Sequence, residues 1–157
     1  MKITDFIPRK AILPVLKSRD KKGAIQELVQ AARKAFEGEK FSAAEVVDGI
    51  VAREKKGSTG LGEGVGIPHE KLEGIKGVIG AFGRAPAGID WSSVDGAPVT
   101  LVFLILAPPS KSEAYLQALQ KVTGAMRRPN FLKFLRAAKA CKDIEEIFRE
   151  VEEVAPV

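Results

Sequence analysis

Hydrophobic positions in the first sixty residues follow a short strand pattern and then two amphipathic helix patterns. Residues 11–16, AILPVL, form an apolar run with a proline, which is typical of a buried or edge strand. In residues 21–36 the apolar side chains recur every three or four positions, which predicts a helix with one buried face. A second such helix is predicted over 41–57, where Ser42 begins a capping-box spacing and Gly57 can end the helix.

The second half of the chain carries a stronger strand signal. Residues 76–86 alternate enough to be a strand, and residues 99–109 form a continuous apolar, β-branched run that two prolines end. Such a run is typical of a central strand that is buried on both faces, and this burial requires helices on both sides of the sheet. Three helix patterns follow at 110–128, 129–140 and 142–153, with expected caps at Ser110, Asn130 and Asp143. The order of elements predicts an α/β protein, a three-layer α/β/α sandwich with a mixed, mostly buried sheet.

Composition is consistent with one ordinary globular domain. The chain has 157 residues, of which 45% are hydrophobic, so we expect a single domain over 1–157 with one packed core. No apolar run is long enough to cross a bilayer, and the N-terminal residues lack the apolar stretch of a signal peptide. The one cysteine, Cys141, cannot form an internal disulfide. These features predict a cytoplasmic protein.

The charge of the chain is modestly basic. The formal net charge is +5 and the isoelectric point is about 9.4. Acidic residues are interleaved with the basic ones, aromatic residues make up 6%, and no nucleic-acid recognition motif is present. The basic patches therefore indicate a solvated face, and we predict no nucleic-acid partner.

The candidate chemistry gathers in residues 57–71, GSTGLGEGVGIPHEK, where the only histidine follows a series of glycines. Bare backbone N–H groups can form a concavity that binds phosphate. However, the P-loop and dinucleotide-binding patterns are both missing, and so is the G-x-S-x-G motif of serine nucleophiles. His69 has no second histidine with which to hold zinc, so the sequence predicts no metal site.

One chemistry fits a lone histidine in this setting. Near neutral pH much of a free imidazole is uncharged, and its unprotonated nitrogen is a competent acceptor of a phosphoryl group. The site must then position the group and offset its charge. We predict that Arg53 supplies a guanidinium and that a loop supplies donors through Ser58, Thr59, Gly60, Gly62 and Gly64. The alternative stays open that His69 makes ordinary hydrogen bonds and that the glycines only form a tight turn.

The residues around His69 resemble the signature of a known family. Residues 52–71, AREKKGSTGLGEGVGIPHEK, are similar to the pattern R-E-x-x-G-S-T-G-x-G-x-G-x-x-x-P-H of the fructose/mannitol-type (type 2) IIA domains of the bacterial phosphotransferase system, which include the nitrogen-regulatory IIA proteins. The resemblance continues in residues 89–109, IDWSSVDGAPVTLVFLILAPP, and in residues 115–138. It covers almost the whole chain and implies the same three-layer fold.

The resemblance also implies an activity and partners. His69 would accept a phosphoryl group on Nε2 from the phosphohistidine of the carrier protein HPr and pass it to a cysteine of a IIB domain, which makes the chain a phosphotransferase component. Arg53 matches the family's arginine that steadies the phosphoryl group. The resemblance implies no metal or organic cofactor, and it implies contact with the membrane only through a separate permease.

Two positions depart from the family pattern. Tyr115 stands where the family has a second active-site histidine; a tyrosine can donate a hydrogen bond to a phosphoryl oxygen but cannot carry a positive charge. The alternative is an ordinary half-buried helix residue. Glu70 stands where glycine is common, and its carboxylate would repel a phosphoryl group unless it points away.

Three functions remain open from the sequence. The first is a IIA component of phosphoenolpyruvate-dependent sugar uptake. The second is a nitrogen-type regulatory IIA protein, whose phosphorylation state decides which target protein it binds. The third is a IIA-like module that binds an anion or a partner without being phosphorylated.

Overall fold

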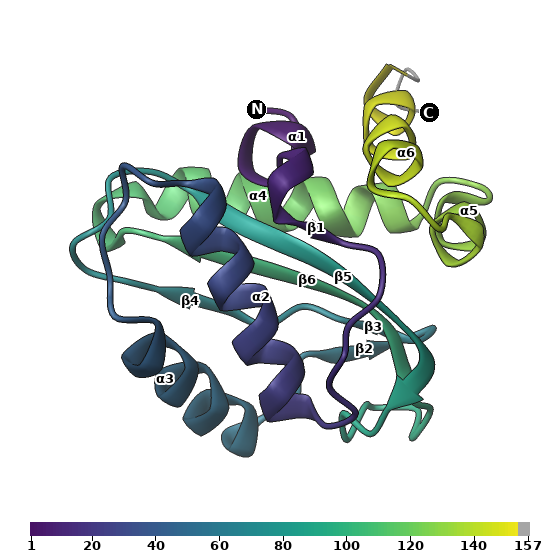
Figure 1. The fold of residues 1–157 in the computed structure, drawn as a ribbon, viewed down its shortest axis with the longest axis horizontal. Coiled ribbons are helices and arrows are strands. Elements are labelled where there is room, and N and C mark those ends of the chain that lie inside the picture. Colours follow the sequence, from purple (N-terminus) through teal and green to yellow (C-terminus); the bar gives the residue numbers. More distant parts are fainter. Residues whose placement is uncertain (154–157) are drawn as a thin grey trace.

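The computed structural model describes residues 1–153 and consists of one mixed sheet between two layers of helices (Figure 1). The strands are β1 (Ile12–Leu13), β2 (Gly60–Gly62), β3 (Val65–Gly66), β4 (His69–Lys71), β5 (Ile79–Ile89) and β6 (Val99–Ala107). The helices are α1 (Ile3–Phe6), α2 (Lys21–Ala35), α3 (Ala43–Lys56), α4 (Ser112–Met126), α5 (Phe131–Ala137) and α6 (Cys141–Glu153).

Strand β6 lies at the centre of the sheet, and the strand that carries the only histidine pairs with it. The strand order is β1-β5-β6-β3-β2, and β4 also pairs with β6. Strand β5 runs antiparallel to β6, whereas β3 and β4 run parallel to it along one edge. Val65 pairs with Leu101, and His69 pairs with Ile105 further along. Strands β3 and β4 are therefore successive segments on the same side of β6, and His69 is the first residue after the interruption between them.

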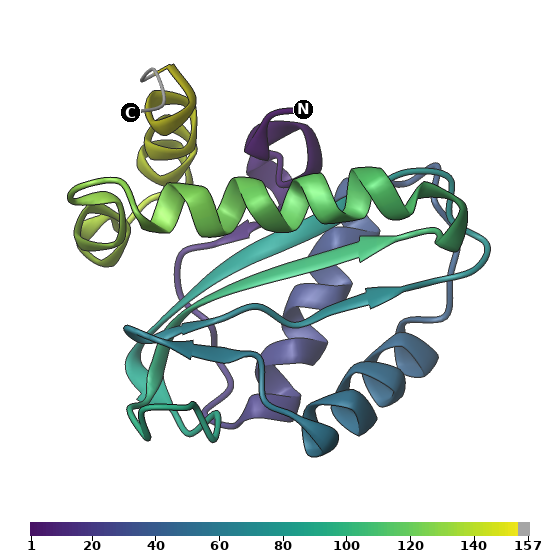
Figure 2. The same ribbon diagram turned by 180° about the vertical axis from the view of Figure 1, so that it is seen from behind.

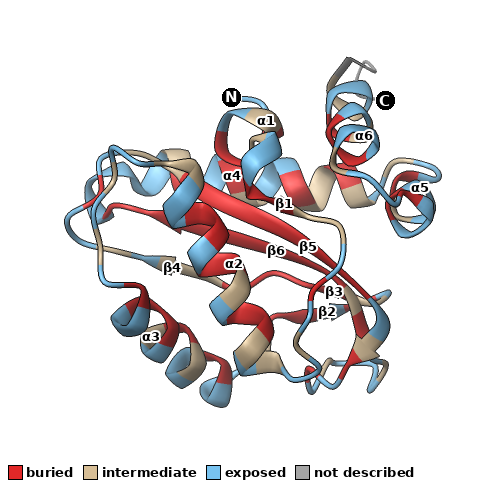
Figure 3. Ribbon diagram, viewed as in Figure 1, coloured by how far each residue is buried: buried red, intermediate tan, exposed pale blue. Residues whose placement is uncertain are grey.

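The two helical layers bury both faces of this sheet. Helices α2 and α3 lie over one face, and α1, α4, α5 and α6 lie over the other (Figures 1 and 2). Alternate residues of β6 enter the two hydrophobic clusters, so that Val102 and Leu104 pack toward α2 and α3, and Phe103 and Ile105 pack toward α4. Figure 3 shows β6 and the first part of β5 as buried segments, whereas β5 has exposed residues near its end. The predicted three-layer sandwich and the predicted central strand are confirmed.

Of the three helix caps predicted for the last third of the chain, Asn130 holds the N-cap position of its helix, whereas Ser110 and Asp143 do not cap theirs. A 3-10 turn over Pro109–Lys111 follows β6, so α4 begins after Ser110 and that residue does not cap it. Asn130 precedes α5 in a left-handed conformation, with φ of 66°, and its side chain makes no capping hydrogen bond. Asp143 lies inside the first turn of α6, because that helix already begins at Cys141. The helices themselves lie where their apolar periodicity predicts them.

Candidate functional site

His69 lies at the edge of the sheet on β4 and is half-buried. The backbone on both sides of it is fixed to β6: the N–H of Ile105 donates to the carbonyl of Pro68 at 3.1 Å, and the N–H of Leu72 donates to the carbonyl of Ala107 at 2.8 Å. The ring is thus carried by hydrogen-bonded strand and not by a free loop. A side chain on a rigid element keeps its orientation better than one on a loop.

The surroundings of the imidazole ring fix which nitrogen carries the proton. Nδ1 lies 2.6 Å from the carbonyl oxygen of Ile67, which can only accept, so Nδ1 is the protonated nitrogen. Nε2 lies 3.0 Å from Nη2 of Arg53, which can only donate, so Nε2 presents its lone pair. The ring is therefore a neutral tautomer with Nε2 as its nucleophilic nitrogen.

Electrostatics favour the same neutral ring. Burial lowers the pKa of His69, and the positive charge of Arg53 lowers it further. The hydrogen bond to the carbonyl of Ile67 and the charge of Glu54 act in the opposite direction. The net effect is a pKa below the ordinary value of a histidine, so Nε2 keeps its lone pair at neutral pH.

Arg53 reaches the imidazole from the last turns of α3. The helix begins as the sequence predicts, because the Ser42 hydroxyl accepts from the N–H of Glu45 at 3.3 Å. Near its other end Arg53 is exposed, whereas the next residue, Glu54, is buried. Two neighbouring residues of one helix therefore serve opposite sides of the site.

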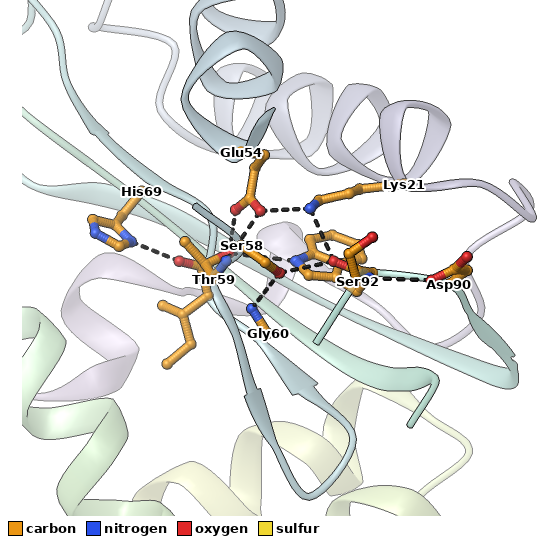
Figure 4. Close-up of polar contacts among 10 residues, drawn as sticks. Lys21, Glu54, Ser58, Thr59, Gly60, His69, Asp90 and Ser92 are labelled. Atoms are coloured by element: carbon orange, nitrogen blue, oxygen red, sulfur yellow. Dashed lines mark hydrogen bonds and ion pairs between the residues drawn. The ribbon is translucent and has the colours of Figure 1, made fainter. Parts of the chain in front are cut away.

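A continuous series of polar contacts supports the imidazole from behind, and Figure 4 shows most of it. The carboxylate of Glu54 pairs with Nζ of Lys21 at 2.6 Å and accepts from both the N–H, at 3.0 Å, and the hydroxyl of Thr59. The carbonyl of Thr59 accepts from the N–H of Ile67 at 3.1 Å, and the carbonyl of Ile67 binds Nδ1 of His69. We call Lys21, Glu54, Thr59 and Ile67 the supporting network.

Ser58 and Gly60 take part in a neighbouring set of contacts that anchors the same segment. The Ser58 hydroxyl donates to the carbonyl of Trp91 at 2.8 Å and accepts from the N–H of Gly60 at 3.0 Å. Lys21 donates to the same carbonyl at 3.1 Å, and its ammonium lies 5.1 Å from the centre of the Trp91 ring. The hydroxyls of Ser58 and Thr59 and the N–H groups of Thr59 and Gly60 are thus all engaged inside the protein.

The structure does not bring the two remaining loop glycines to the imidazole. Gly62 ends β2 and Gly64 lies in the turn between β2 and β3, with φ of 95° and 77° respectively. The carbonyl of Gly64 accepts from the N–H of Thr100, five strand positions before the partner of His69 on β6. At about 3.3 Å per residue, this separates the turn from His69 by roughly 16 Å. The glycines serve the hairpin, whose backbone favours residues without a side chain.

Tyr115 is brought next to His69 by α4, as the sequence predicts. It lies in the first turn of that helix, its side chain is buried, and its ring centre lies 5.9 Å from that of the imidazole. Burial raises the pKa of its hydroxyl, and the Arg53 charge opposes that rise. The phenol therefore remains protonated and can only act near His69 as a neutral group.

Lys71 is a further residue of the site, and the sequence reasoning missed it. It follows His69 by two positions, which places both side chains on the same side of β4. Its Nζ lies 5.7 Å from the centre of the Tyr115 ring and donates to the Ser112 hydroxyl at 2.9 Å. The period of two along a strand could have indicated it. We call Arg53, Lys71 and Tyr115 the donor cluster.

Glu70 lies between these two residues in the chain and turns to the other side. Its carboxylate packs against α3 at Gly49, where a Cβ atom would lie only 2.7 Å from one carboxylate oxygen. Burial raises the pKa of Glu70, and the charge of Arg53 opposes this. The carboxylate is therefore directed away from the side of the strand that carries His69 and Lys71.

Two properties of residues 1–153 bear on other kinds of site. No helix in this range combines the length and the apolar character that crossing a membrane requires. Within the same residues, no three His, Cys, Asp or Glu side chains gather as they would around a metal ion.

Fold and site together define a class of α/β/α protein that presents one oriented, neutral imidazole beside a guanidinium at the edge of its sheet. The family model described as "Phosphoenolpyruvate-dependent sugar phosphotransferase system, EIIA 2" matches residues 5–151. The chain belongs to this family.

Relatives of the chain have two kinds of name. A nitrogen regulatory protein of Bradyrhizobium diazoefficiens is 41% identical over 147 residues, which is 94% of each chain. The fructose-specific EIIABC component of Bacillus subtilis is 33% identical over 150 residues, which is 96% of this chain but 23% of that protein. The crystal structure of the nitrogen regulatory protein IIA-Ntr from Neisseria meningitidis has a TM-score of 0.83 and 31% identity, over 93% of this chain and 98% of that one.

Proposed function

We propose that this chain is a phosphohistidine carrier of the phosphotransferase system, and that Nε2 of His69 accepts a phosphoryl group from phospho-HPr. The observation that carries the proposal is the pair of contacts on the imidazole, Nδ1 to the carbonyl of Ile67 and Nε2 to Arg53. Together they leave a neutral ring whose lone pair points to the outer, exposed side of the site. Membership of the family supports the same activity.

The transfer step needs no movement of protons at His69. The lone pair of Nε2 attacks phosphorus, and a new N–P bond forms as the N–P bond of the donor phosphohistidine breaks. The bonding electron pair stays on the donor nitrogen, which leaves as a neutral imidazole. The proton on Nδ1 of His69 stays in place throughout, hydrogen-bonded to the carbonyl of Ile67. In the onward step the same Nδ1–H lets His69 leave as a neutral ring.

Arg53 changes partner during this step. Its Nη2 occupies the direction of the Nε2 lone pair, so the guanidinium must move aside when phosphorus arrives. Its exposed side chain allows this movement. Planar N–H donors then suit the phosphoryl oxygens, and their charge offsets the negative charge that the transfer brings.

The proposal is tested by incubating the purified protein with phosphoenolpyruvate, Enzyme I and HPr. We expect one phosphoryl group per chain, and we expect it to be labile in acid, unlike a phosphate ester of serine, threonine or tyrosine. The His69→Ala variant should take up no label. Because the chain has one histidine, loss of label in this variant identifies the residue without ambiguity.

Control variants remove other nucleophiles that the chain offers. Cys141→Ser and Ser58→Ala should both retain the acid-labile label, since neither side chain contacts the imidazole. Labelling of His69→Ala at the wild-type level would overturn the proposal. Absence of label from the wild-type protein would leave the third function, a IIA-like module that works without phosphorylation.

For the output of the carrier we propose regulation of the nitrogen type. The observation that favours it is the Bradyrhizobium diazoefficiens nitrogen regulatory protein, which matches this chain over 94% of both lengths. The alternative is sugar uptake, in which a IIB cysteine attacks phosphorus and His69 leaves. The observation that supports this alternative is the similarity to the fructose-specific EIIABC component of Bacillus subtilis. In both cases the carrier would act in the cytoplasm, and a separate permease would be its only route to the membrane.

The two outputs differ in the fate of the phosphorylated protein. A regulatory protein binds its target in one phosphorylation state only, so affinity for that target should differ between the wild type and His69→Ala under phosphorylating conditions. A sugar-uptake component transfers its label to a purified fructose-type IIB domain. Rapid and complete transfer to such a domain would contradict a regulatory output.

A further inference from the structure

A cavity of about 440 Å³ lies between the start of α2 and the end of α3, and we call it the α2–α3 cavity. Figure 4 labels part of its lining, the residues Lys21, Glu54, Ser58 and Ser92. The two helices contribute six of the lining side chains: Lys21, Lys22, Ile25, Val51, Glu54 and Lys55. Because pockets of a few hundred Å³ hold small molecules in other proteins, the volume is sufficient for a small ligand.

The lining of the α2–α3 cavity has a surplus of two positive charges. Its three lysine ammonium groups face one carboxylate, that of Glu54, which already binds Nζ of Lys21 at 2.6 Å. Lys22 and Lys55 are exposed, and neither has a carboxylate partner among the described residues. An anion in the cavity would therefore offset two like charges that these residues leave unpaired.

The cavity also offers an apolar surface, which narrows the kind of anion that suits it. Ile25 is buried and Val51 is half-buried, and both line the cavity beside the lysines. A bare inorganic ion leaves that surface uncovered, whereas a short organic group covers it. Above neutral pH a phosphate monoester carries about two negative charges, which equals the surplus of the lining. A single carboxylate offsets only half of it.

We propose that the α2–α3 cavity binds a small phosphate monoester, whose phosphate lies between Lys22 and Lys55 and whose organic group covers Ile25 and Val51. Lysine ammonium groups bind phosphate as point charges, so the phosphate links one helix to the other. No covalent bond forms or breaks in this binding. The Lys21–Glu54 pair stays intact beside the ligand.

The α2–α3 cavity shares a wall with the supporting network of the imidazole. Lys21 and Glu54 line the cavity, and their contacts continue through Thr59 and the carbonyl of Ile67 to Nδ1 of His69. A ligand that links α2 to α3 therefore acts on the contacts that orient the ring. The site lies behind the histidine, and it is distinct from the donor cluster in front of it.

The test uses n-butyl phosphate, titrated into the unphosphorylated wild type in slightly alkaline buffer. The only tryptophan, Trp91, reports binding by its fluorescence, because Nζ of Lys21 lies 5.1 Å from the centre of its ring. We expect a saturable change in emission, with a midpoint at least about 10-fold lower than that of inorganic phosphate. The uncharged analogue 1-butanol should give no saturable change.

Urea unfolding provides a second measure that does not depend on fluorescence. A ligand that binds only the folded protein, at ten times its dissociation constant, should lower the unfolding equilibrium constant about 11-fold. If n-butyl phosphate changes neither the emission of Trp91 nor the unfolding equilibrium, the inference is wrong.

Two matched double variants test whether the cavity itself binds the anion. Lys22→Met/Lys55→Met removes the two lysines proposed to hold the phosphate, and the midpoint should rise at least about 10-fold. Lys34→Met/Lys56→Met removes one exposed lysine from each of the same helices outside the cavity, and the midpoint should stay within about twofold. Equal weakening in both variants would mean that the anion responds to overall charge, and the proposed site would not exist.

A ring C–H resonance of His69 shows whether the ligand reaches the imidazole, and Arg53→Ala shows from which side. We expect the resonance to move with the same midpoint as the Trp91 emission, in the wild type and in Arg53→Ala. Binding that is lost in Arg53→Ala and kept in Lys22→Met/Lys55→Met would place the anion at the donor cluster and overturn the inference. A saturating emission with a stationary resonance would refute the link to His69. None of these outcomes affects the carrier function, because no phosphoryl group is transferred in the experiment.

Discussion

The two nitrogens of His69 face regions of opposite character. Behind Nδ1 lies the supporting network, in which the carboxylate, ammonium and backbone groups of Lys21, Glu54, Thr59 and Ile67 have partners within the protein. In front of Nε2 lies the donor cluster of Arg53, Lys71 and Tyr115, with one exposed guanidinium and one unpartnered hydroxyl. One region is complete without any further group, and the other has donors in excess of acceptors.

This difference teaches how a single histidine can serve as a carrier. A reacting ring must be held in one orientation and one tautomer, and that role needs groups that do not change partner. In the proposed function the same ring would accept and release a charged group, and that role would need donors that are free to change partner. At the edge of the sheet each role falls to a different nitrogen of the ring: Nδ1 holds the orientation, and Nε2 faces the donors.

The largest effect is expected from a break in the supporting network. In Glu54→Ala, the ammonium of Lys21 and the N–H of Thr59 lose their partner in a buried place. We expect the free energy of unfolding to fall by about 3 kcal/mol, the low end for removing one member of a buried ion pair, because the Lys21 side chain is 22% exposed. Urea denaturation measures the change.

The exposed Lys55, one position along the same helix, provides the matched control. Lys55→Ala should change the free energy of unfolding by no more than about 0.5 kcal/mol. If Glu54→Ala changes it as little as Lys55→Ala does, the region behind Nδ1 is not a rigid support for the ring.

A break in the donor cluster should alter reactivity and leave stability almost unchanged. Arg53→Ala removes the guanidinium that faces Nε2, and we expect labelling by phospho-HPr to slow about 100-fold, as for the loss of one preorganised donor. Because Arg53 is exposed, the free energy of unfolding of the Arg53→Ala variant should differ from that of the wild type by no more than about 0.5 kcal/mol. Rapid-quench labelling and urea denaturation measure the two effects.

Arg53→Lys sharpens this result, because lysine keeps the charge but loses the planar array of donors. The labelling rate of Arg53→Lys should lie below that of the wild type and above that of Arg53→Ala. A labelling rate for Arg53→Ala within about threefold of the wild-type rate would mean that the donor cluster does not assist the transfer.

Much of the scaffold could be predicted from local sequence patterns. The run at 99–109 is apolar throughout, and only a strand covered on both faces accommodates that pattern, as β6 confirms. The periodicity over 21–36 and 41–57 likewise places α2 and α3 within a residue or two. By contrast, β2, β3 and β4 have two or three residues each, too few to predict a strand from alternation alone.

The candidate site was predicted in part, and the missing part has a physical reason. The sequence predicts that the glycine series supplies donors to His69, but most of the series forms the β2–β3 hairpin, whose turn lies far from the imidazole. Lys21 and Glu54 belong to different helices, and their ion pair follows from the packing of α2 against α3. No local pattern encodes such a contact, so the supporting network emerges only from the fold.

The smallest effect concerns pH, and its sign follows from the surroundings of the ring. Burial, aided by Arg53, lowers the pKa of folded His69, whereas an unfolded histidine titrates near 6.5. Between the two pKa values the unfolded chain binds a proton that the folded protein does not, so the stability contributed by His69 is lost as pH falls through this window. Above about pH 6.5 both states are neutral, and the contribution is complete.

A proton NMR titration that follows one ring C–H resonance of the only histidine gives the folded pKa. We expect Arg53→Ala to raise that pKa. A folded midpoint above neutral pH would mean that Nε2 is mostly protonated there, and the contrast between the two nitrogens would then disappear.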